Sequence, residues 1–206
     1  MSETPEAMHD TLFVVDALTG IAGGAIPTEI TLFCYLGCLL GMFDEQPSST
    51  WGYSFTATKT VAPYSASLDD CLKGAVNSGL VTDTGNGYVL TDAGQRELQF
   101  LSELSRFSRR RTYLIAGCNS GLVVPMPRVG AAIAAEPELR RALALSSSRQ
   151  LLGDGGAGAL HAHFEALSEA LPDDAGLFVT AVTWVSYLAS GSDIQEDSVA
   201  AGVGGA

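Results

Sequence analysis

The chain has 206 residues, of which 47% are hydrophobic and 17% charged, and its net charge is −12. This length accommodates one core, or one domain with a helical extension, and the apolar composition favours a surface that is partly covered by a partner or by self-association. The acidity excludes nucleic-acid binding through the general surface, so any such contact requires a local basic patch.

Two helices are predicted near the N-terminus. Residues 1–8 are expected to be frayed, and because the N-terminal sequence is acidic and polar it is not a secretory signal, which predicts a cytoplasmic location. A first helix is predicted over residues 9–22 and ends at glycine. Pro27 opens a second helix over residues 29–42, and its apolar residues run nearly all round, which places it at the centre of the fold.

The apolar run of residues 30–43 is shorter than the about 20 residues that a membrane-spanning helix needs, and so is the run of residues 177–189. Both are predicted to be buried helices, and no membrane contact is expected. The cysteines do not supply the paired ligand sets of a metal site, so we expect buried, reduced thiols and no metal or other cofactor; they are Cys34, Cys38, Cys71 and Cys118.

Residues 44–49 are predicted to be a loop, and residues 51–55 a short strand with three aromatic side chains on one face. In a winged helix such a strand can pair, as a third strand, with a hairpin at residues 80–90, so packing in the core or on the hairpin is the favoured interpretation. The alternative is an aromatic platform on which nucleic-acid bases stack. No basic residue is interleaved before Lys59, which favours packing within the protein.

The most informative stretch is residues 62–94. Ser65 or Ser67 is suited to cap a helix over residues 66–78, in which apolar residues recur at intervals of three and four. Gly79 follows and suits the left-handed conformation that ends many helices.

Two short strands are predicted to follow, at residues 80–82 and 88–90, because the turn residues aspartate, glycine and asparagine lie between them. Thr91 or Asp92 is suited to cap the next helix. Helix, hairpin and helix form the end of a winged-helix domain. The predicted class is therefore mainly α and winged-helix-like, with a small β-hairpin wing and a C-terminal helical extension.

A helix predicted over residues 92–115 ends in a cluster of four arginines, the strongest local excess of positive charge in the chain. The favoured interpretation is a solvated C-terminal helix end, where cations stabilise the helix dipole. The functional alternative is contact with phosphate groups or with an acidic partner. Together with one lysine and one tyrosine from the preceding stretch, these arginines are the candidate contact residues: Arg106, Arg109, Arg110, Arg111, Lys73 and Tyr64.

A break is expected at residues 117–130, which are rich in glycine and proline. The predicted parts of the chain are a winged-helix-like domain at residues 1–115, a helical extension at 116–192 and a flexible tail at 193–206. Within the extension we predict helices over residues 131–145, with a turn or a new helix opening at 136–138, over 160–171 and over 175–188.

No catalytic motif emerges from the sequence. Asn119 occupies the centre of Gly117–Gly121, where a nucleophile elbow needs serine. The glycine-rich residues 153–158 lack the lysine of a phosphate loop, which favours a flexible link. His161 and His163 are two residues apart and point to different sides of a helix, so we expect exposed histidines and not a zinc pair.

The order of these features resembles a known family. Ala62-Pro63-Tyr64-Ser65 leads a helix, Gly79-Leu80-Val81 follows it, and Tyr88-Val89-Leu90-Thr91 precedes Gly94. This order is similar to the Panacea (SocA-like) domain, whose pattern is a Gly-Pro-Tyr-Ser turn, a helix, a Gly-Leu-Ile strand and a Leu-Thr-x-x-Gly return. Ala62 stands where the family usually has glycine. Similar segments occur in the small middle components of three-component ATPase defence systems.

The resemblance, over roughly residues 10–110, implies an antitoxin, adaptor or phage-defence role through protein contacts, and it supplies no catalytic residues. The predicted function is a non-enzymatic subunit that binds another protein in a hetero-complex, with a homo-oligomer left open. The alternative is a winged-helix regulator that binds DNA, but residues 66–79 hold two aspartates and one lysine, which disfavours it. An enzyme is the third hypothesis, supported only by the glycine-rich stretches.

Overall fold

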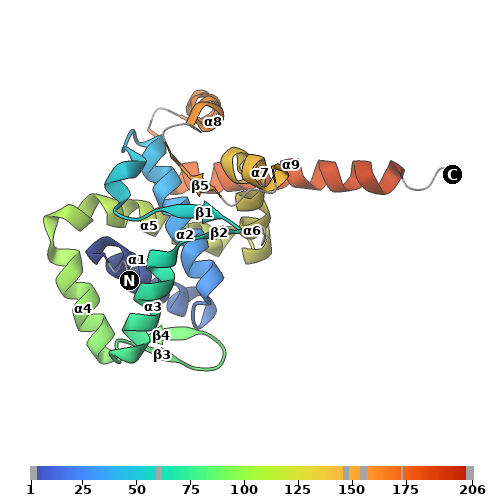
Figure 1. The fold of residues 1–206 in the computed structure, drawn as a ribbon. Helices are drawn as coiled ribbons and strands as arrows, with labels where there is room; N and C mark the ends of the chain where they lie inside the picture. The colour runs from blue at the N-terminus through green and yellow to red at the C-terminus, as the bar shows by residue number, and fades with distance from the viewer. Residues whose placement is uncertain (1–3, 59–61, 146–148, 154–156, 173, 203–206) are drawn as a thin grey trace.

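The computed structural model describes residues 4–58, 62–145, 149–153, 157–172 and 174–202, and it is mainly helical (Figure 1). The helices are α1 (Pro5–Ala22), α2 (Pro27–Phe43), α3 (Ala66–Asn77), α4 (Asp92–Glu103), α5 (Ser105–Val123), α6 (Met126–Ala135), α7 (Pro137–Ala144), α8 (Ala157–Ala170) and α9 (Leu177–Gly202), with a 3-10 turn at Ser48–Trp51. The short strands are β1 (Phe55–Ala57), β2 (Pro63–Tyr64), β3 (Val81–Asp83), β4 (Tyr88–Leu90) and β5 (Gln150–Leu151). The predicted class, mainly α with a small β wing, is confirmed.

Helix α2 forms the centre of the fold, as its apolar sequence predicted. It packs against α5 and α1, and nearly all of its residues from Ile30 to Gly41 are buried. Because a helix that is apolar on all sides is stable only when other elements surround it, this burial fixes where the remaining helices pack. The core then continues from α2 through α5 to α6 and α9.

The helix, hairpin and helix predicted for residues 62–94 are confirmed as α3, β3, β4 and α4. Gly79 has a φ of 73°, the left-handed conformation expected after α3. Ser65 occupies the N-cap position of α3, although its side chain makes no capping hydrogen bond. Thr91 caps α4, because its hydroxyl accepts a hydrogen bond from the Gly94 amide at 3.2 Å.

The predicted third strand of this hairpin is wrong. Residues 51–55 do not pair with it: Trp51 lies in the 3-10 turn, and β1 pairs with β2 and β5 in a separate sheet. Ala25 takes the third position instead and exchanges two backbone hydrogen bonds with Tyr88, at 3.0 and 2.8 Å. The physical reason is that α1 packs on β4, so the short link after α1 carries Ala25 to the hairpin edge.

Two helix boundaries at the start of the chain and around residue 104 differ from the predictions. Helix α1 begins at Pro5, because the Thr4 hydroxyl accepts a hydrogen bond from the Ala7 amide, so the residues from Pro5 onward are helical and not frayed. The single helix predicted over residues 92–115 is two helices, since Leu104 has an extended conformation that separates α4 from α5.

The break predicted at residues 117–130 lies later than expected. Helix α5 continues through Gly117 and ends at Val123, because Gly117 and the residues around it pack against α2. The predicted boundary after residue 115 therefore falls inside a helix. Strand β5, from the predicted extension, also joins the sheet of β1.

The remaining helices follow the predictions with changes at their ends. Glu136 opens α7 as a new helix, one of the two predicted alternatives, and α8 lies within one turn of its predicted range. Helix α9 continues past its predicted end at residue 188 to Gly202, and its C-terminal half extends away from the body of the protein (Figure 1). The part of the glycine-rich link at residues 154–156 and the tail residues 203–206 lie outside the described residues.

Gly94 marks a close approach between α4 and Leu80, the residue directly before β3. A Cβ atom at this position would lie 2.1 Å from the Leu80 carbonyl oxygen. Gly94→Ala must therefore push α4 away from β3, and we expect a loss of about 1–3 kcal/mol or more in the free energy of unfolding. The shift of the urea midpoint measures this loss.

Gly130 provides the matched control for this substitution. It lies inside α6, and an added Cβ atom would meet nothing within 4 Å. Gly130→Ala should stabilise the protein by about 0.5–1 kcal/mol, because alanine restricts the unfolded chain. Equal effects of the two substitutions would show that the contact with Leu80 is not what requires glycine at position 94.

Candidate functional site

The four predicted arginines lie in the first two turns of α5, and not at the C-terminal end of a helix. Leu104 interrupts the predicted helix, and α5 restarts one residue later. The interpretation of these cations as charges that stabilise a C-terminal helix dipole is therefore wrong. Their side-chain partners decide what they do.

Arg110 is the buried member of the cluster, with 7% of its side chain exposed. Its Nε donates to both carboxylate oxygens of Asp10, at 2.7 and 2.8 Å, and its Nη2 donates to the carbonyl oxygen of Trp51. The guanidinium lies 3.9 Å from the centroid of the Trp51 ring. Arg110 therefore joins α1 and the 3-10 turn to α5, and it is not a surface contact residue.

The exposed arginines also have partners within the chain. Arg106 lies 3.6 Å from the Glu6 carboxylate of α1, and Arg109 lies 3.1 Å from Asp44 at the end of α2. The Tyr113 hydroxyl donates to the same Asp44 carboxylate at 2.5 Å. Arg111 is exposed. Three of the four arginines therefore form ion pairs with acidic residues near other helices, and these pairs hold α1 and the end of α2 against α5.

The two other predicted contact residues, Tyr64 and Lys73, lie together around Asp69 on α3. Lys73 Nζ is 2.6 Å from the Asp69 carboxylate, and the Tyr64 hydroxyl donates to the same oxygen at 3.4 Å. Helices α3 and α5 both pack on α1. The structure thus brings Tyr64 and Lys73 together, but it does not join them to the arginines.

A buried polar cluster around Asp10 was not found by the sequence analysis. Besides Arg110, the Asp10 carboxylate accepts a hydrogen bond from the Tyr53 hydroxyl at 2.6 Å and lies 3.0 Å from His9 Nδ1. His9 and Asp10 are fully buried, and the His9 ring stacks on Phe107. The available signal was a histidine next to an aspartate in a predicted helix, but the Tyr53 and Arg110 side chains that bind Asp10 are more than forty residues away.

The environment of Asp10 stabilises its charged form. Burial raises the pKa of this carboxyl. The Arg110 charge and the hydrogen bonds from His9 and Arg110 lower the pKa, and together they outweigh burial, so the pKa of Asp10 lies below its ordinary value. The same burial and the Asp10 charge raise the pKa of Tyr53 well above its ordinary value, which keeps its hydroxyl protonated as the donor.

This shift predicts an acid-sensitive contribution to stability. Because the folded pKa of Asp10 lies below the unfolded one, about 3.9, the contribution is complete above the unfolded pKa and is lost as the pH falls through the folded pKa. Urea unfolding of the native chain and of Asp10→Asn, measured from neutral pH downwards, should show free-energy curves that converge below about pH 4. A constant difference between the curves would contradict the assignment.

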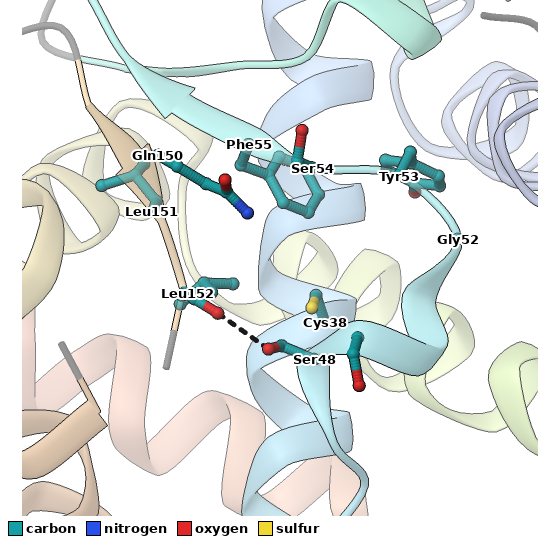
Figure 2. Close-up of a pocket in the computed structure, with 11 residues that line it drawn as sticks. Cys38, Ser48, Gly52, Tyr53, Ser54, Phe55, Gln150, Leu151 and Leu152 are labelled. Carbon is teal, nitrogen blue, oxygen red and sulfur yellow. Dashed lines mark hydrogen bonds between the residues drawn. The ribbon is translucent and has the colours of Figure 1, made fainter. Parts of the chain in front are cut away.

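A hollow of about 560 Å³ lies beside this cluster, between the 3-10 turn, the start of β1 and β5 (Figure 2). The Gln150 side chain extends from β5 toward Phe55 and Ser54, and the Ser48 hydroxyl donates to the Leu152 carbonyl oxygen at 2.7 Å. The lining is uncharged: Cys38, Ser48, Ser49, Gly52, Tyr53, Ser54, Phe55, Gln150, Leu151, Leu152 and Gly153. Its volume suits a small ligand, and its lining offers neutral hydrogen-bonding groups only.

Two side-chain contacts hold the β5 wall of this hollow in place. Arg149, directly before β5, lies 3.0 Å from the Glu138 carboxylate of α7. Glu136 caps α7 by accepting from the Glu138 and Leu139 amides, and it also accepts from the Tyr35 hydroxyl of α2 at 2.8 Å. Helix α7 is thereby anchored to the central helix, and β5 is anchored to α7.

A second hollow, of about 1110 Å³, lies on the other side of Ser48 between the loop after α2 and α8. Its walls carry charges of both signs, because Asp44, Arg109 and Glu165 all line it, with His161 beside them. Arg109 and Asp44 neutralise each other across this wall. The hollow therefore has no excess of positive charge with which to hold a phosphate group.

The arrangement does not assemble a nucleophile with a base. Burial raises the pKa of the Cys38 thiol, which keeps it protonated and a poor nucleophile. The four cysteines are buried, as predicted, and none of them forms a disulfide bond. Across the described part of the chain, no group of three or more His, Cys, Asp or Glu side chains is placed to hold a metal ion.

Comparison with protein-family models, with curated proteins and with solved structures found no match. Within the described residues, no helix combines the length and the apolar character that crossing a bilayer requires.

Proposed function

We propose that this chain is a non-enzymatic protein-interaction subunit, an adaptor or regulator in a bacterial multi-protein system, of the kind to which the resemblance to the Panacea (SocA-like) domain points. Anti-phage defence and toxin–antitoxin control are the two contexts that the resemblance implies, both in the cytoplasm. The proposal depends on the charge of one surface, that of α3 and its wing.

The surface on which a winged helix would read DNA is acidic in this chain. Asp69 and Asp70 lie on α3 and Asp83 lies at the tip of β3, whereas the one lysine of α3, Lys73, is paired with Asp69. Carboxylates placed in a groove of DNA face phosphates and lose the attraction that most DNA-binding proteins gain from lysine and arginine. This charge is the observation that supports a protein partner over a nucleic acid.

Exposed apolar side chains support the same proposal. Two helices of the C-terminal half carry several of them. Because only 17% of the residues in the chain are charged, we infer that a partner covers this apolar surface. These side chains are Ile115, Leu122 and Val123 of α5 and Phe178, Val179 and Tyr187 of α9.

Fluorescence anisotropy with a labelled random duplex tests the proposal against the DNA-binding alternative. At about 150 mM salt, we expect a dissociation constant no tighter than about 1 μM, the range of non-specific contact. The control is the variant Arg109→Glu/Arg111→Glu, which changes exposed cations and leaves the buried Arg110 in place. Tighter binding by the native chain that this variant loses would move the function to the class of DNA-binding regulators.

A further inference from the structure

The hollow between the 3-10 turn and β5 carries neutral polar groups that the protein itself does not use. Its volume of about 560 Å³ lies in the range of small-molecule pockets, about 300–1,000 Å³. Within the described part of the chain, the Gln150 amide and the hydroxyls of Ser49 and Ser54 have no hydrogen-bonding partner. Figure 2 shows one hydrogen bond among the lining residues, from Ser48 to Leu152. The donor and the acceptor of the Gln150 amide are therefore both available to a bound molecule.

The charge of the lining restricts what this molecule can be. No charged side chain lines the hollow. Two arginines adjoin the lining residues, but Arg110 is paired with Asp10, and Arg149 is paired with Glu138. A phosphate, a carboxylate or an amine that entered the hollow would lose water without gaining a counter-charge. The hollow therefore favours an uncharged ligand that makes hydrogen bonds.

The aromatic residues of the segment 51–55 form part of the same wall. Tyr53 and Phe55 line the hollow, with their ring centroids 5.4 Å apart, and the Gln150 side chain extends toward Phe55 (Figure 2). Trp51 is not in the lining, because its ring packs on Arg110. The segment is therefore not an open platform for a strand of bases, but two of its three rings adjoin a space that accommodates one base.

The backbone of Leu152 supports a binding role for this wall. Leu152 is 6% exposed and has a φ of 58°, a left-handed conformation that is uncommon for a residue other than glycine. Such conformations persist only where surrounding contacts hold them, and they cluster at ligand-binding sites. Here the holding contact is the hydrogen bond from the Ser48 hydroxyl to the Leu152 carbonyl oxygen, which joins the two walls of the hollow.

We propose that this hollow binds a single uncharged adenine nucleoside. A glutamine amide pairs with adenine through two hydrogen bonds, because the base edge presents an amino donor beside a ring-nitrogen acceptor. Gln150 supplies that amide, the rings of Tyr53 and Phe55 contact the base, and the hydroxyls of Ser49 and Ser54 bind the ribose. The site goes beyond the proposed adaptor function and does not depend on it.

Calorimetric titration of the full chain with three ligands tests the chemistry of the site. Adenosine should bind saturably at one site with a dissociation constant of about 1 mM or tighter. Purine riboside has the same shape but lacks the 6-amino donor, and it should bind about 10-fold more weakly or worse. Adenosine 5′-monophosphate should also bind more weakly, because the lining holds no cation for its phosphate.

Two pairs of variants locate the site. Gln150→Leu removes the amide from an exposed position and should weaken adenosine binding about 10- to 100-fold, whereas Gln99→Leu, on the exposed face of α4, should not change it. Ser49→Trp fills the hollow and should abolish binding, whereas Thr50→Trp alters the next residue, which is exposed and outside the lining, and should retain binding. Thermal melting of each variant shows whether it is folded.

Three results would each overturn the inference: no saturable binding of adenosine, equal or tighter binding of the monophosphate, and equal affinity for adenosine and purine riboside. All three come from the native chain, so they do not depend on the folding of a variant. Unchanged binding by a folded Gln150→Leu variant would place the nucleoside elsewhere and would overturn the inference as well. The DNA titration concerns α3 and α5, so it decides the adaptor proposal separately.

Discussion

Replacing Arg110 with methionine is expected to lower the free energy of unfolding by about 3–5 kcal/mol. The substitution leaves the Asp10 carboxylate, fully buried, without the cation that makes two hydrogen bonds to it. An isolated buried charge is strongly destabilising, because the protein interior solvates it far less well than water does. The cation–π contact with Trp51 is lost as well. Urea unfolding at neutral pH measures the effect.

Arg109→Met is the matched control, because Arg109 is one residue away and its ion pair with Asp44 is exposed to solvent. That pair should contribute no more than about 1 kcal/mol. The double variant Asp10→Leu/Arg110→Met removes both buried charges and should recover part of the loss. Similar losses for Arg109→Met and Arg110→Met would contradict the assignment of Arg110 as a buried structural residue.

The second large effect is expected for Leu36→Asp, which should abolish the cooperative thermal transition. Leu36 is fully buried in the middle of α2, the helix around which the fold is packed. A charge placed there without a partner costs several kcal/mol, against a total stability of about 5–15 kcal/mol for a typical domain.

Leu122→Asp makes the same chemical change at a position on α5 that is 63% exposed, and it should leave the melting temperature nearly unchanged. Leu36→Met, which preserves volume and polarity, should cost less than about 1.5 kcal/mol. An unaltered midpoint for Leu36→Asp would mean that α2 is not central to the fold.

The features that the sequence predicted well are those that neighbouring residues decide. Glycine in the left-handed conformation at position 79 and a threonine cap at position 91 are local preferences of the backbone, and they located α3, β3, β4 and the start of α4 within about one residue. The burial of α2 followed from its composition, because an apolar helix has only one stable environment in water.

Features that depend on residues far apart in the chain could not be predicted from the sequence. Ala25 and not residue 51 pairs with the hairpin, because the packing of α1 decides which segment reaches the hairpin edge. The hollow beside Ser48 forms only where β5 joins β1 across almost a hundred residues of chain. Neither contact has a signal in the residues adjacent to it.

The arginines of residues 106–111 show the same difference between what neighbouring residues determine and what distant residues determine. The sequence determined that a cluster of positive charge exists at residues 106–111, but four arginines on one helix look alike before the fold is known. The tertiary structure decided that Arg110 is buried in the core, where it pairs with Asp10 of α1. Arg109 lies on the surface and pairs with Asp44. The reason is physical: the energy of a charge depends on its surroundings in space, and those surroundings come from segments up to a hundred residues away.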